Sequence, residues 1–269
     1  MNNYACDDAG GHGMINPMEL TGRNILVTGA AQGIGEAVAR LAHQLGAKVI
    51  LNDLNQEKLE SVASDLGERV ETHAGSVADY DFVQGMVQQA ADSCGAIHGF
   101  VNNAGIVRAA MAKNMTKETW QSVIDVNLSG AFYCLQAVGQ HMLKRIEDGD
   151  TSPAAIVNIS SDAGRRGTIG QINYGAAKSG VLGLTMSAAR EWSQFGVRVN
   201  SVLFGAVETP MTEVILSDKF RDGLMAQIPM NRVATPAEVS KPVCFLLSEG
   251  ASYMTGQHVS VNGGYTIGV

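Results

Sequence analysis

Three side chains in the middle of the chain have the types and the spacing for proton transfer. Tyr174 and Lys178 are four positions apart, which places a phenol and an ammonium group one turn apart on the same face of a helix. A phenol has a pKa of about 10, so it serves as a general base near neutrality only if a neighbour such as Lys178 lowers that pKa. Ser161 lies thirteen residues before Tyr174, just past a predicted strand, where its hydroxyl can hydrogen-bond the same substrate oxygen.

A second group of residues has the chemistry of a phosphate site. The segment Thr28-Gly29-Ala30-Ala31-Gln32-Gly33-Ile34-Gly35 lies between a predicted strand and a predicted helix. Residues without a Cβ allow a sharp turn and a close approach of the backbone to a pyrophosphate, and the N–H groups of a helix N-terminus favour an anion. The spacing is Gly-x-x-x-Gly-x-Gly, and the alternative is that these glycines serve only a turn and close packing.

Asp53 ends the second predicted strand, 18 residues after Gly35. A carboxylate at this place can accept hydrogen bonds from both hydroxyls of an adenosine ribose and repels a 2′-phosphate. The alternative role is a helix cap or a turn. Gln32 and Leu54 stand where cations would welcome a 2′-phosphate, so we expect NAD(H) to be preferred over NADP(H).

These residues lie in an alternating series of strand and helix patterns. Apolar runs predict strands at 24–28, 48–53, 69–75, 98–102, 154–160, 197–203 and 259–262, and helical periodicity predicts helices at 33–45, 55–66, 79–94, 117–145 and 174–195. Strands that are apolar on both faces indicate a parallel sheet covered by helices on each side. The prediction is an α/β fold, a single doubly wound Rossmann domain with seven parallel strands over residues 19–269, preceded by a flexible tail at 1–18.

Composition excludes several classes of function. The chain has 269 residues and a net charge of −7, which argues against a nucleic-acid partner. The four cysteines are far apart and form no Cys-x-x-Cys pair, so we expect free thiols, and no His or Cys spacing predicts a metal site. No apolar run is long enough to cross a membrane and the first 18 residues do not form a secretory signal, so the expected location is cytoplasmic.

Taken together, the motifs resemble the short-chain dehydrogenase/reductase family. The resemblance rests on the order and intervals of Thr28–Gly35, Asn102-Asn103-Ala104-Gly105, Asn127, Ser161 and Tyr174-x-x-x-Lys178, and it covers the chain from about Leu20 to Gly264. Within the family, Pro229–Gly264 and Gly170-Gln171-x-Asn173-Tyr174 are similar to the 3-oxoacyl-[acyl-carrier-protein] reductase group.

The resemblance implies roles for individual residues. Tyr174 would be the general acid/base and Ser161 would hold the substrate oxygen, while Lys178 would bind the nicotinamide ribose and Asn127 would hold a water that links Lys178 to solvent. Gln171 is expected to contact the substrate together with Ser161 and Tyr174. The cofactor contacts it implies are Gly29, Gln32, Gly33, Ile34, Gly35, Asp53, Ser76, Val77, Asn103, Ala104, Gly105, Tyr174, Lys178, Gly205, Val207 and Thr209. It also implies a homotetramer.

Three departures from the family pattern affect the site. Phe204-Gly205 stands where Pro-Gly is usual, so the nicotinamide position is expected to differ. Ser76 replaces a common aspartate at the adenine. Asp162 follows the serine where apolar residues are usual, and Arg165-Arg166 come just after it; these charges either line the mouth of the pocket or belong to a solvated loop.

The function expected from the sequence is an NAD(H)-dependent oxidoreductase that interconverts a secondary alcohol and a ketone, with a small-molecule substrate. The alternative is a 3-oxoacyl-[acyl-carrier-protein] or 3-hydroxyacyl thioester reductase, although the acidic residues after Lys144-Arg145 and the apolar Phe195 weaken docking of a carrier protein. A non-catalytic dinucleotide sensor and a sugar-nucleotide epimerase are more remote alternatives, since a sensor has no need of Ser161, Tyr174 and Lys178.

Overall fold

Seven parallel strands form the centre of the molecule. The computed structural model describes residues 16–213, 216 and 218–268. Positions 1–15 of the predicted tail at 1–18 therefore lie outside the described residues. The strands are β1 (Asn24–Thr28), β2 (Lys48–Asp53), β3 (Val70–Ala74), β4 (Gly99–Asn102), β5 (Ala154–Ser161), β6 (Val197–Phe204) and β7 (His258–Val261). Their order in the sheet is β3-β2-β1-β4-β5-β6-β7, which confirms the predicted doubly wound fold.

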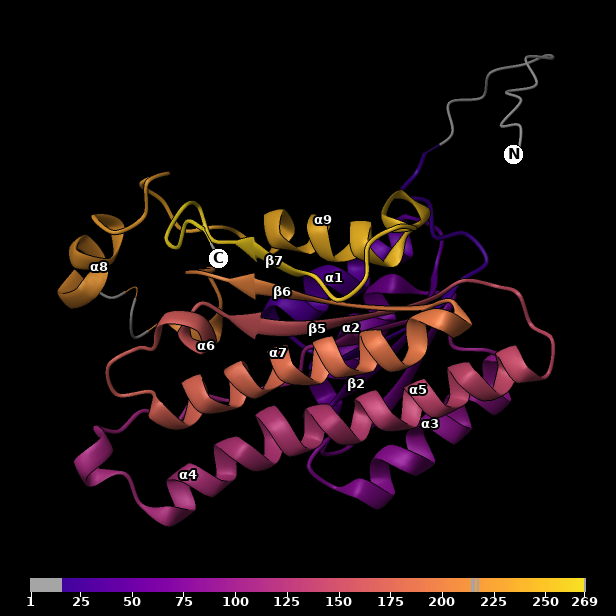
Figure 1. The fold of residues 1–269 in the computed structure, drawn as a ribbon, viewed down its shortest axis with the longest axis horizontal. Helices are drawn as coiled ribbons and strands as arrows, with labels where there is room; N and C mark the ends of the chain where they lie inside the picture. Colours follow the sequence, from indigo (N-terminus) through magenta and orange to yellow (C-terminus); the bar gives the residue numbers. More distant parts are fainter. Residues whose placement is uncertain (1–15, 214–215, 217, 269) are drawn as a thin grey trace.

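Helices cover both faces of this sheet. The α-helices are α1 (Gly33–Gln44), α2 (Gln56–Leu66), α3 (Tyr80–Cys94), α4 (Lys117–Ile124), α5 (Ala131–Glu147), α6 (Ala163–Arg166), α7 (Ile172–Trp192), α8 (Asp218–Met225) and α9 (Pro236–Leu247). In Figure 1, α9 lies above the strands β5 to β7, while α3, α5 and α7 lie below them. The helix α1 packs against α9 on the same core. None of the helices that the structure describes has both the length and the apolar character needed to cross a bilayer.

The two hydrophobic cores follow from the two-residue period of a strand. Ile25 and Val27 of β1 belong to the core beneath α1 and α9, whereas Leu26 between them belongs to the core beneath α3, α5 and α7. Because every second residue must be apolar on each covered face, the central strands are continuous apolar runs. This is why the strand boundaries predicted from the sequence agree closely with those observed.

The site is placed by the point at which the chain reverses its direction of winding. β1 pairs with β2 on one side and with β4 on the other, so the connections on either side of β1 run in opposite directions. A crevice opens at the carboxyl ends of strands at such a switch point. The ends of β1, β4, β5 and β6 are Thr28, Asn102, Ser161 and Phe204, and each lies within or beside a predicted motif.

The long helix predicted at 117–145 has an internal irregularity. Its hydrogen bonding changes to that of a π-helix at Asp125–Gly130, between α4 and α5. A π-turn takes up one extra residue per turn, which rotates side chains out of the regular helical order and is frequent at functional sites. Asn127 lies in this turn and is fully buried.

Candidate active site

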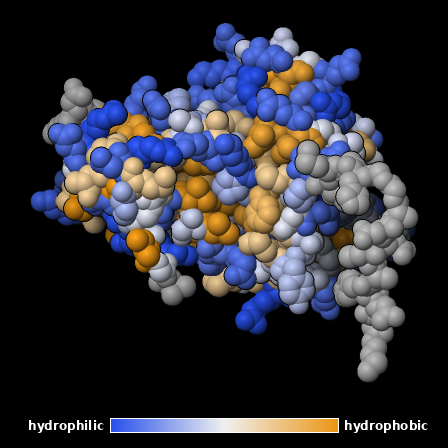
Figure 2. Space-filling model, turned by 90° about the horizontal axis from the view of Figure 1, so that it is seen from above, coloured by the Kyte–Doolittle hydropathy of each residue, from blue (hydrophilic) through white to orange (hydrophobic). Residues whose placement is uncertain are grey.

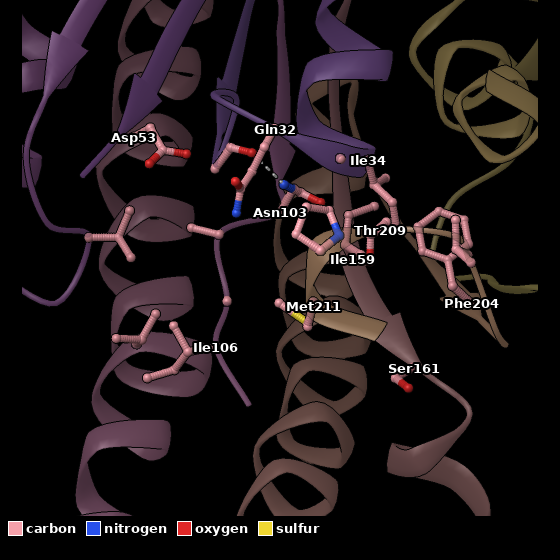
Figure 3. A pocket seen from close by; sticks show the side chains of 18 of the residues that line it. Gln32, Ile34, Asp53, Asn103, Ile106, Ile159, Ser161, Phe204, Thr209 and Met211 are labelled. Carbon is pink, nitrogen blue, oxygen red and sulfur yellow. Dashed lines mark hydrogen bonds between the residues drawn. The ribbon is translucent and has the colours of Figure 1, made fainter. Parts of the chain in front are cut away.

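A cavity of about 560 Å³ opens at the carboxyl ends of the strands. The glycine-rich turn after β1 and Asp53 at the end of β2 line one part, and Ser161, Tyr174 and Lys178 line another. Figure 3 shows Asp53 and Ser161 at opposite corners of the view, with Thr209 and Met211 between them. Of the predicted cofactor contacts, only Gly35 is not among the lining residues. The predicted contacts that do line the cavity are Gly29, Gln32, Gly33, Ile34, Asp53, Ser76, Val77, Asn103, Ala104, Gly105, Tyr174, Lys178, Gly205, Val207 and Thr209.

Lys178 and Tyr174 project from the first two turns of α7, as their spacing predicts. The Lys178 Nζ lies 5.8 Å from the centroid of the Tyr174 ring and donates a hydrogen bond of 2.8 Å to the carbonyl of Ile159 in β5. The residue is only 4% exposed, so its ammonium is held at a defined place beside the phenol.

Burial dominates the electrostatics of this pair. Burial raises the pKa of Tyr174, and the nearby Ser161 hydroxyl opposes the rise. Burial lowers the pKa of Lys178 to about 8. We expected Lys178 to lower the pKa of the phenol, but the cost of burying a phenolate is the largest influence and the pKa is raised. Tyr174 is therefore a protonated acid at neutral pH.

Ser161 is the last residue of β5. Its Oγ accepts a hydrogen bond of 3.2 Å from the backbone N–H of Ala163, so the turn that follows the strand orients the hydroxyl. Ser160, the preceding residue, faces the other way and donates a hydrogen bond of 2.8 Å to the carbonyl of Lys178. The strand that carries the serine is thus bonded to the helix that carries the tyrosine.

Asn127 uses both ends of its amide on one neighbour. Its Oδ1 accepts from the N–H of Ile106 at 2.8 Å, and its Nδ2 donates to the carbonyl of Ile106 at 2.9 Å. A Cβ on Gly105 would lie 3.4 Å from Asn127 Oδ1 and 3.6 Å from Lys178 Nζ. Asn127 therefore anchors the chain after β4 beside Lys178, and its predicted role in holding a water stays a prediction.

Asn173 is a further residue of the site that has no role in the sequence analysis. It is fully buried, and its Nδ2 donates to the carbonyls of Arg108 at 3.0 Å and Thr119 at 3.3 Å. Its Oδ1 accepts from the N–H of Tyr174 at 2.8 Å. One side chain thus joins the loop after β4, the helix α4 and the start of α7. The sequence analysis includes it in the motif Gly170-Gln171-x-Asn173-Tyr174 but assigns it no contact.

The glycine-rich turn is held by the segment after β4. Asn103 Nδ2 donates to the carbonyls of Thr28 at 2.9 Å and Gly29 at 3.2 Å. A Cβ on Gly29 would lie 2.9 Å from Asn103 Nδ2, and Gly29 has a φ of +67°, so a residue with a side chain does not fit there. A Cβ on Gly35 would overlap the carbonyl oxygen of Gly29, which explains the last glycine of the motif by packing.

Asp53 is oriented by two backbone amides. Its Oδ2 accepts from the N–H of Ala31 at 3.1 Å, and its Oδ1 accepts from the N–H of Asn55 at 3.0 Å. Each oxygen keeps a free lone pair for a hydroxyl group. Gln32 accepts a hydrogen bond of 2.8 Å from Lys58, the cation that lies nearest to it among the contacts described.

The shape and chemistry of the cavity fit a nicotinamide dinucleotide. The N-terminus of α1 faces the cavity at Gly33 and Ile34, where N–H groups suit a pyrophosphate. Asn52, another lining residue, is 1% exposed and its Oδ1 has no hydrogen-bond partner among the residues that the structure describes, which leaves an acceptor for a polar ligand. Ser76 uses its Oγ to accept from the N–H of Ala78.

Some predicted contacts lie outside the lining of the cavity. Gln171 directly precedes α7, and its backbone carbonyl accepts from the N–H of Gly175, but its side chain does not line the cavity. Arg165 donates to Ser260 Oγ at 3.2 Å, and the guanidinium of Arg166 lies 3.7 Å above the ring of Tyr265. The two arginines thus contact the C-terminal segment instead of lining the cavity.

A family model described as "Enoyl-(Acyl carrier protein) reductase" matches residues 29–266 of this chain. The matched range contains Gly29 to Gly35 of the glycine-rich turn, Ser161, Tyr174 and Lys178. The chain belongs to the short-chain dehydrogenase/reductase family.

Relatives within this short-chain dehydrogenase/reductase family cover nearly the whole chain. The 3-oxoacyl-[acyl-carrier-protein] reductase FabG of Thermotoga maritima is 41% identical over 253 residues, which are 93% of this chain and 100% of that protein. Nodulation protein G of Rhizobium sp. strain N33 is 39% identical and covers 91% of this chain and 98% of its own length. The chain is thus similar to the 3-oxoacyl-[acyl-carrier-protein] reductase group of the family.

Solved structures of the short-chain dehydrogenase/reductase family have the same fold. A putative short-chain alcohol dehydrogenase from Sinorhizobium meliloti is 31% identical with a TM-score of 0.86, and covers 93% of this chain and 98% of its own. A glucose/ribitol dehydrogenase-type protein from Brucella melitensis is 33% identical with a TM-score of 0.85, and covers 93% of this chain and 99% of its own.

Proposed function

We propose that this protein reduces the ketone of a 3-oxoacyl thioester to a secondary alcohol, with a nicotinamide dinucleotide as the reductant. The observation that carries the proposal is one cavity that contains Ser161, Tyr174 and Lys178 at one end and the glycine-rich turn with Asp53 at the other. The similarity to the FabG of Thermotoga maritima supports the thioester class. The reverse oxidation uses the same groups.

Tyr174 is the proton donor in this proposal. Burial raises the pKa of its phenol, so the proton is present at neutral pH, where reduction of a ketone needs an acid. Ser161 donates a hydrogen bond to the same substrate oxygen and stabilises the charge that develops on it. Lys178, whose pKa burial lowers to about 8, is still mostly charged at neutral pH and favours the phenolate that remains after transfer. A dinucleotide held in the cavity would supply the hydride.

The proposed cofactor is NADH in preference to NADPH. Asp53, held by the N–H groups of Ala31 and Asn55, presents a carboxylate at the end of β2, where an adenosine ribose lies in a fold of this type. A carboxylate hydrogen-bonds two ribose hydroxyls but repels a phosphate at the 2′ position. Lys58, beside this end of the cavity, donates a hydrogen bond of 2.8 Å to Gln32.

The charges near the ends of the long helices favour a coenzyme A thioester over a carrier protein. Lys144 is paired with Asp148 at 2.6 Å, and Arg145 is 7% exposed and paired with Asp150 at 2.6 Å. Phe195, near the end of α7, is apolar and exposed. A basic patch for an acidic partner is therefore weak here. A simple secondary alcohol is the second candidate substrate. It needs no basic patch, because no acidic carrier protein has to dock.

We also propose that the protein forms a homotetramer. Figure 2 shows hydrophobic side chains gathered in the middle of the face that lies above α9 in Figure 1. Phe132 of α5 and Met186 of α7 are 40% and 47% exposed on the opposite layer. Apolar surfaces on two sides of one chain suit a second copy at each. Light scattering would give the mass of the assembly, and a monomer of 28.3 kDa would contradict the proposal.

The proposed function is tested by the absorbance of NADH with acetoacetyl-CoA as the ketone. We expect consumption of NADH that the Tyr174→Phe variant abolishes, because phenylalanine keeps the ring and removes only the acid. The same assay with NADPH should give a lower kcat/KM. Binding of NADH without consumption of acetoacetyl-CoA would set aside the thioester substrate, and secondary alcohols with NAD⁺ would then be tested. Failure with both classes would favour a non-catalytic sensor.

A further inference from the structure

A buried carboxylate directly follows the serine of the site. Asp162 is 2% exposed, and both of its oxygens accept from Asn262 Nδ2, at 3.1 and 2.9 Å. The two residues are 100 positions apart in the sequence. A buried carboxylate is costly unless hydrogen bonds satisfy it, so this pair is a strong constraint on both segments.

Asp162 is the centre of the turn that orients Ser161. Its backbone N–H donates to the carbonyl of Phe204 at 3.0 Å, and its own carbonyl accepts from the N–H of Arg165 at 3.0 Å. The next residue, Ala163, provides the N–H that bonds Ser161 Oγ at 3.2 Å. A shift of Asp162 therefore moves the amide that holds the serine hydroxyl.

Asn262 links this turn to the wall of the cavity. Its Oδ1 accepts from the N–H of Gly264 at 3.0 Å, and its Nδ2 also donates to the carbonyl of Thr266 at 3.2 Å. A Cβ on Gly205 would lie 2.9 Å from the Cβ of Asn262, and Gly205 lines the cavity. Asn262 thus packs against the cavity wall while it holds Asp162.

The same C-terminal segment contacts the chain that follows α8. The N–H of Met230 donates to the carbonyl of Gly263 at 3.1 Å. Arg166 stacks on Tyr265 and donates to Gln227 Oε1 at 3.4 Å. The segments around Asp162, Asn262 and Gln227 therefore form one connected unit beside the substrate end of the cavity.

We propose that Asp162 is a positioning residue for Ser161, acting through its hydrogen bonds to Asn262. These bonds hold the turn from Ser161 to Ala163, so that the serine hydroxyl faces the substrate oxygen. The inference rests on the proposed function, in which Ser161 holds that oxygen. It also explains why a charged residue stands where apolar residues are usual, since only a carboxylate accepts from Asn262 with both oxygens at this place.

The sharpest test is a double-mutant cycle between Asp162→Asn and Ser161→Ala. Asparagine keeps the shape of the side chain but turns a second donor toward Asn262. We expect kcat for acetoacetyl-CoA to fall about tenfold with an unchanged dissociation constant for NADH, measured by fluorescence. In the Ser161→Ala background we expect no further fall, because there is no hydroxyl left to position. Equal losses in both backgrounds, or no loss in the wild-type background, would overturn the inference.

Exchange of the pair provides a second test. Asn262→Asp alone places two buried carboxylates face to face, and we expect a larger loss of kcat than for Asp162→Asn. The double variant Asp162→Asn/Asn262→Asp restores an acceptor opposite a donor within the pair and should recover part of the rate, although the Thr266 carbonyl loses the donor that Asn262 supplied. No recovery in a double variant that melts like the wild type would contradict the inference. Asp148→Asn, the same substitution on an exposed helix end, is the matched control.

The two levels of proposal fail in different ways. If Ser161→Ala retains the full rate, or if wild-type protein consumes no NADH with any ketone, the proposed function is wrong and the role of Asp162 falls with it. If Ser161→Ala lowers the rate to a measurable remainder but Asp162→Asn lowers it again by the same factor, only the inference about Asp162 is wrong.

Discussion

Ser160 donates its hydroxyl proton to the backbone carbonyl of Lys178 at 2.8 Å, and both residues are buried. This bond ties the end of β5 to the second turn of α7, although the residues are 18 positions apart. Ser161 and Tyr174, which the proposed chemistry uses, lie on those same two elements. The distance between them therefore depends on Ser160, whose hydroxyl is already bonded to the Lys178 carbonyl.

Removal of this bond should affect the reaction more than the fold. Ser160→Ala leaves the Lys178 carbonyl without its side-chain partner, and a lost buried hydrogen bond costs about 1–3 kcal/mol of the free energy of unfolding. We expect the melting temperature to fall by several degrees and kcat for ketone reduction to fall further than in a matched control. Ser240→Ala serves as that control, because the buried Ser240 hydroxyl bonds only the carbonyl of Ala237 within α9. An equal effect of both variants on kcat would contradict the positioning role of Ser160.

The pH dependence of cofactor capture should follow Lys178. Its pKa is lowered to about 8, so its ammonium loses its proton as the pH rises through that value. The kcat/KM for NADH reports groups of the free enzyme, and we expect it to decline above pH 8. The pKa of Tyr174 is raised, so the phenol still carries its proton throughout that decline. A kcat/KM for NADH that stays level to pH 9.5 would show that Lys178 does not control this step.

Asp53 should decide between the two nicotinamide dinucleotides. Asp53→Ser removes the charge that repels a 2′-phosphate and keeps a hydroxyl that can accept from Ala31 or Asn55. We expect the ratio of kcat/KM for NADH over that for NADPH to fall about tenfold or more, since like charges at close range cost several kcal/mol at the edge of a protein. The ratio is obtained from initial rates at subsaturating cofactor. Glu57→Gln, on the exposed first turn of α2, is a control that should leave it unchanged.

Two histidines at the opposite end of the sheet should make stability depend on pH. His98 Nδ1 accepts from the N–H of Asn24, and His141 Nε2 accepts from the N–H of Ile97, both at 3.0 Å. Burial lowers the pKa of both imidazoles, and the charge of Arg145 lowers it further, with Asp150 opposing. The folded protein thus binds fewer protons than the unfolded chain, so stability is full above a pH of about 6.5 and declines as the pH falls below it.

Thermal melts between pH 7.5 and 5 check this prediction. His98→Asn with His141→Gln keeps an acceptor oxygen near each imidazole nitrogen that now accepts, and neither replacement titrates. We expect the double variant to lose less stability between pH 7 and 5 than the wild type does. Parallel curves for the two proteins would show that other groups cause the decline.

Part of this protein is determined by the sequence alone, because the relevant physics is local. A strand buried on both faces needs a continuous apolar run, and the bounds predicted for β1 and β2 agree with those observed. The four-residue spacing of Tyr174 and Lys178 places them on one helix face wherever the helix lies. The glycines of the turn after β1 are needed by its own backbone, because Gly29 and Gly33 have positive φ.

Other features depend on segments that only the folded chain brings together. The hydrogen bond of Asp162 to Asn262 joins residues 100 positions apart, and no periodicity signals it. Asn173 gains its role from the carbonyls of Arg108 and Thr119, which reach it only when α4 packs on α7. The direction in which the pKa of Tyr174 shifts depends on burial, which is a property of the whole packed interior. For that reason the sequence predicts which residue is the acid but not its acid strength.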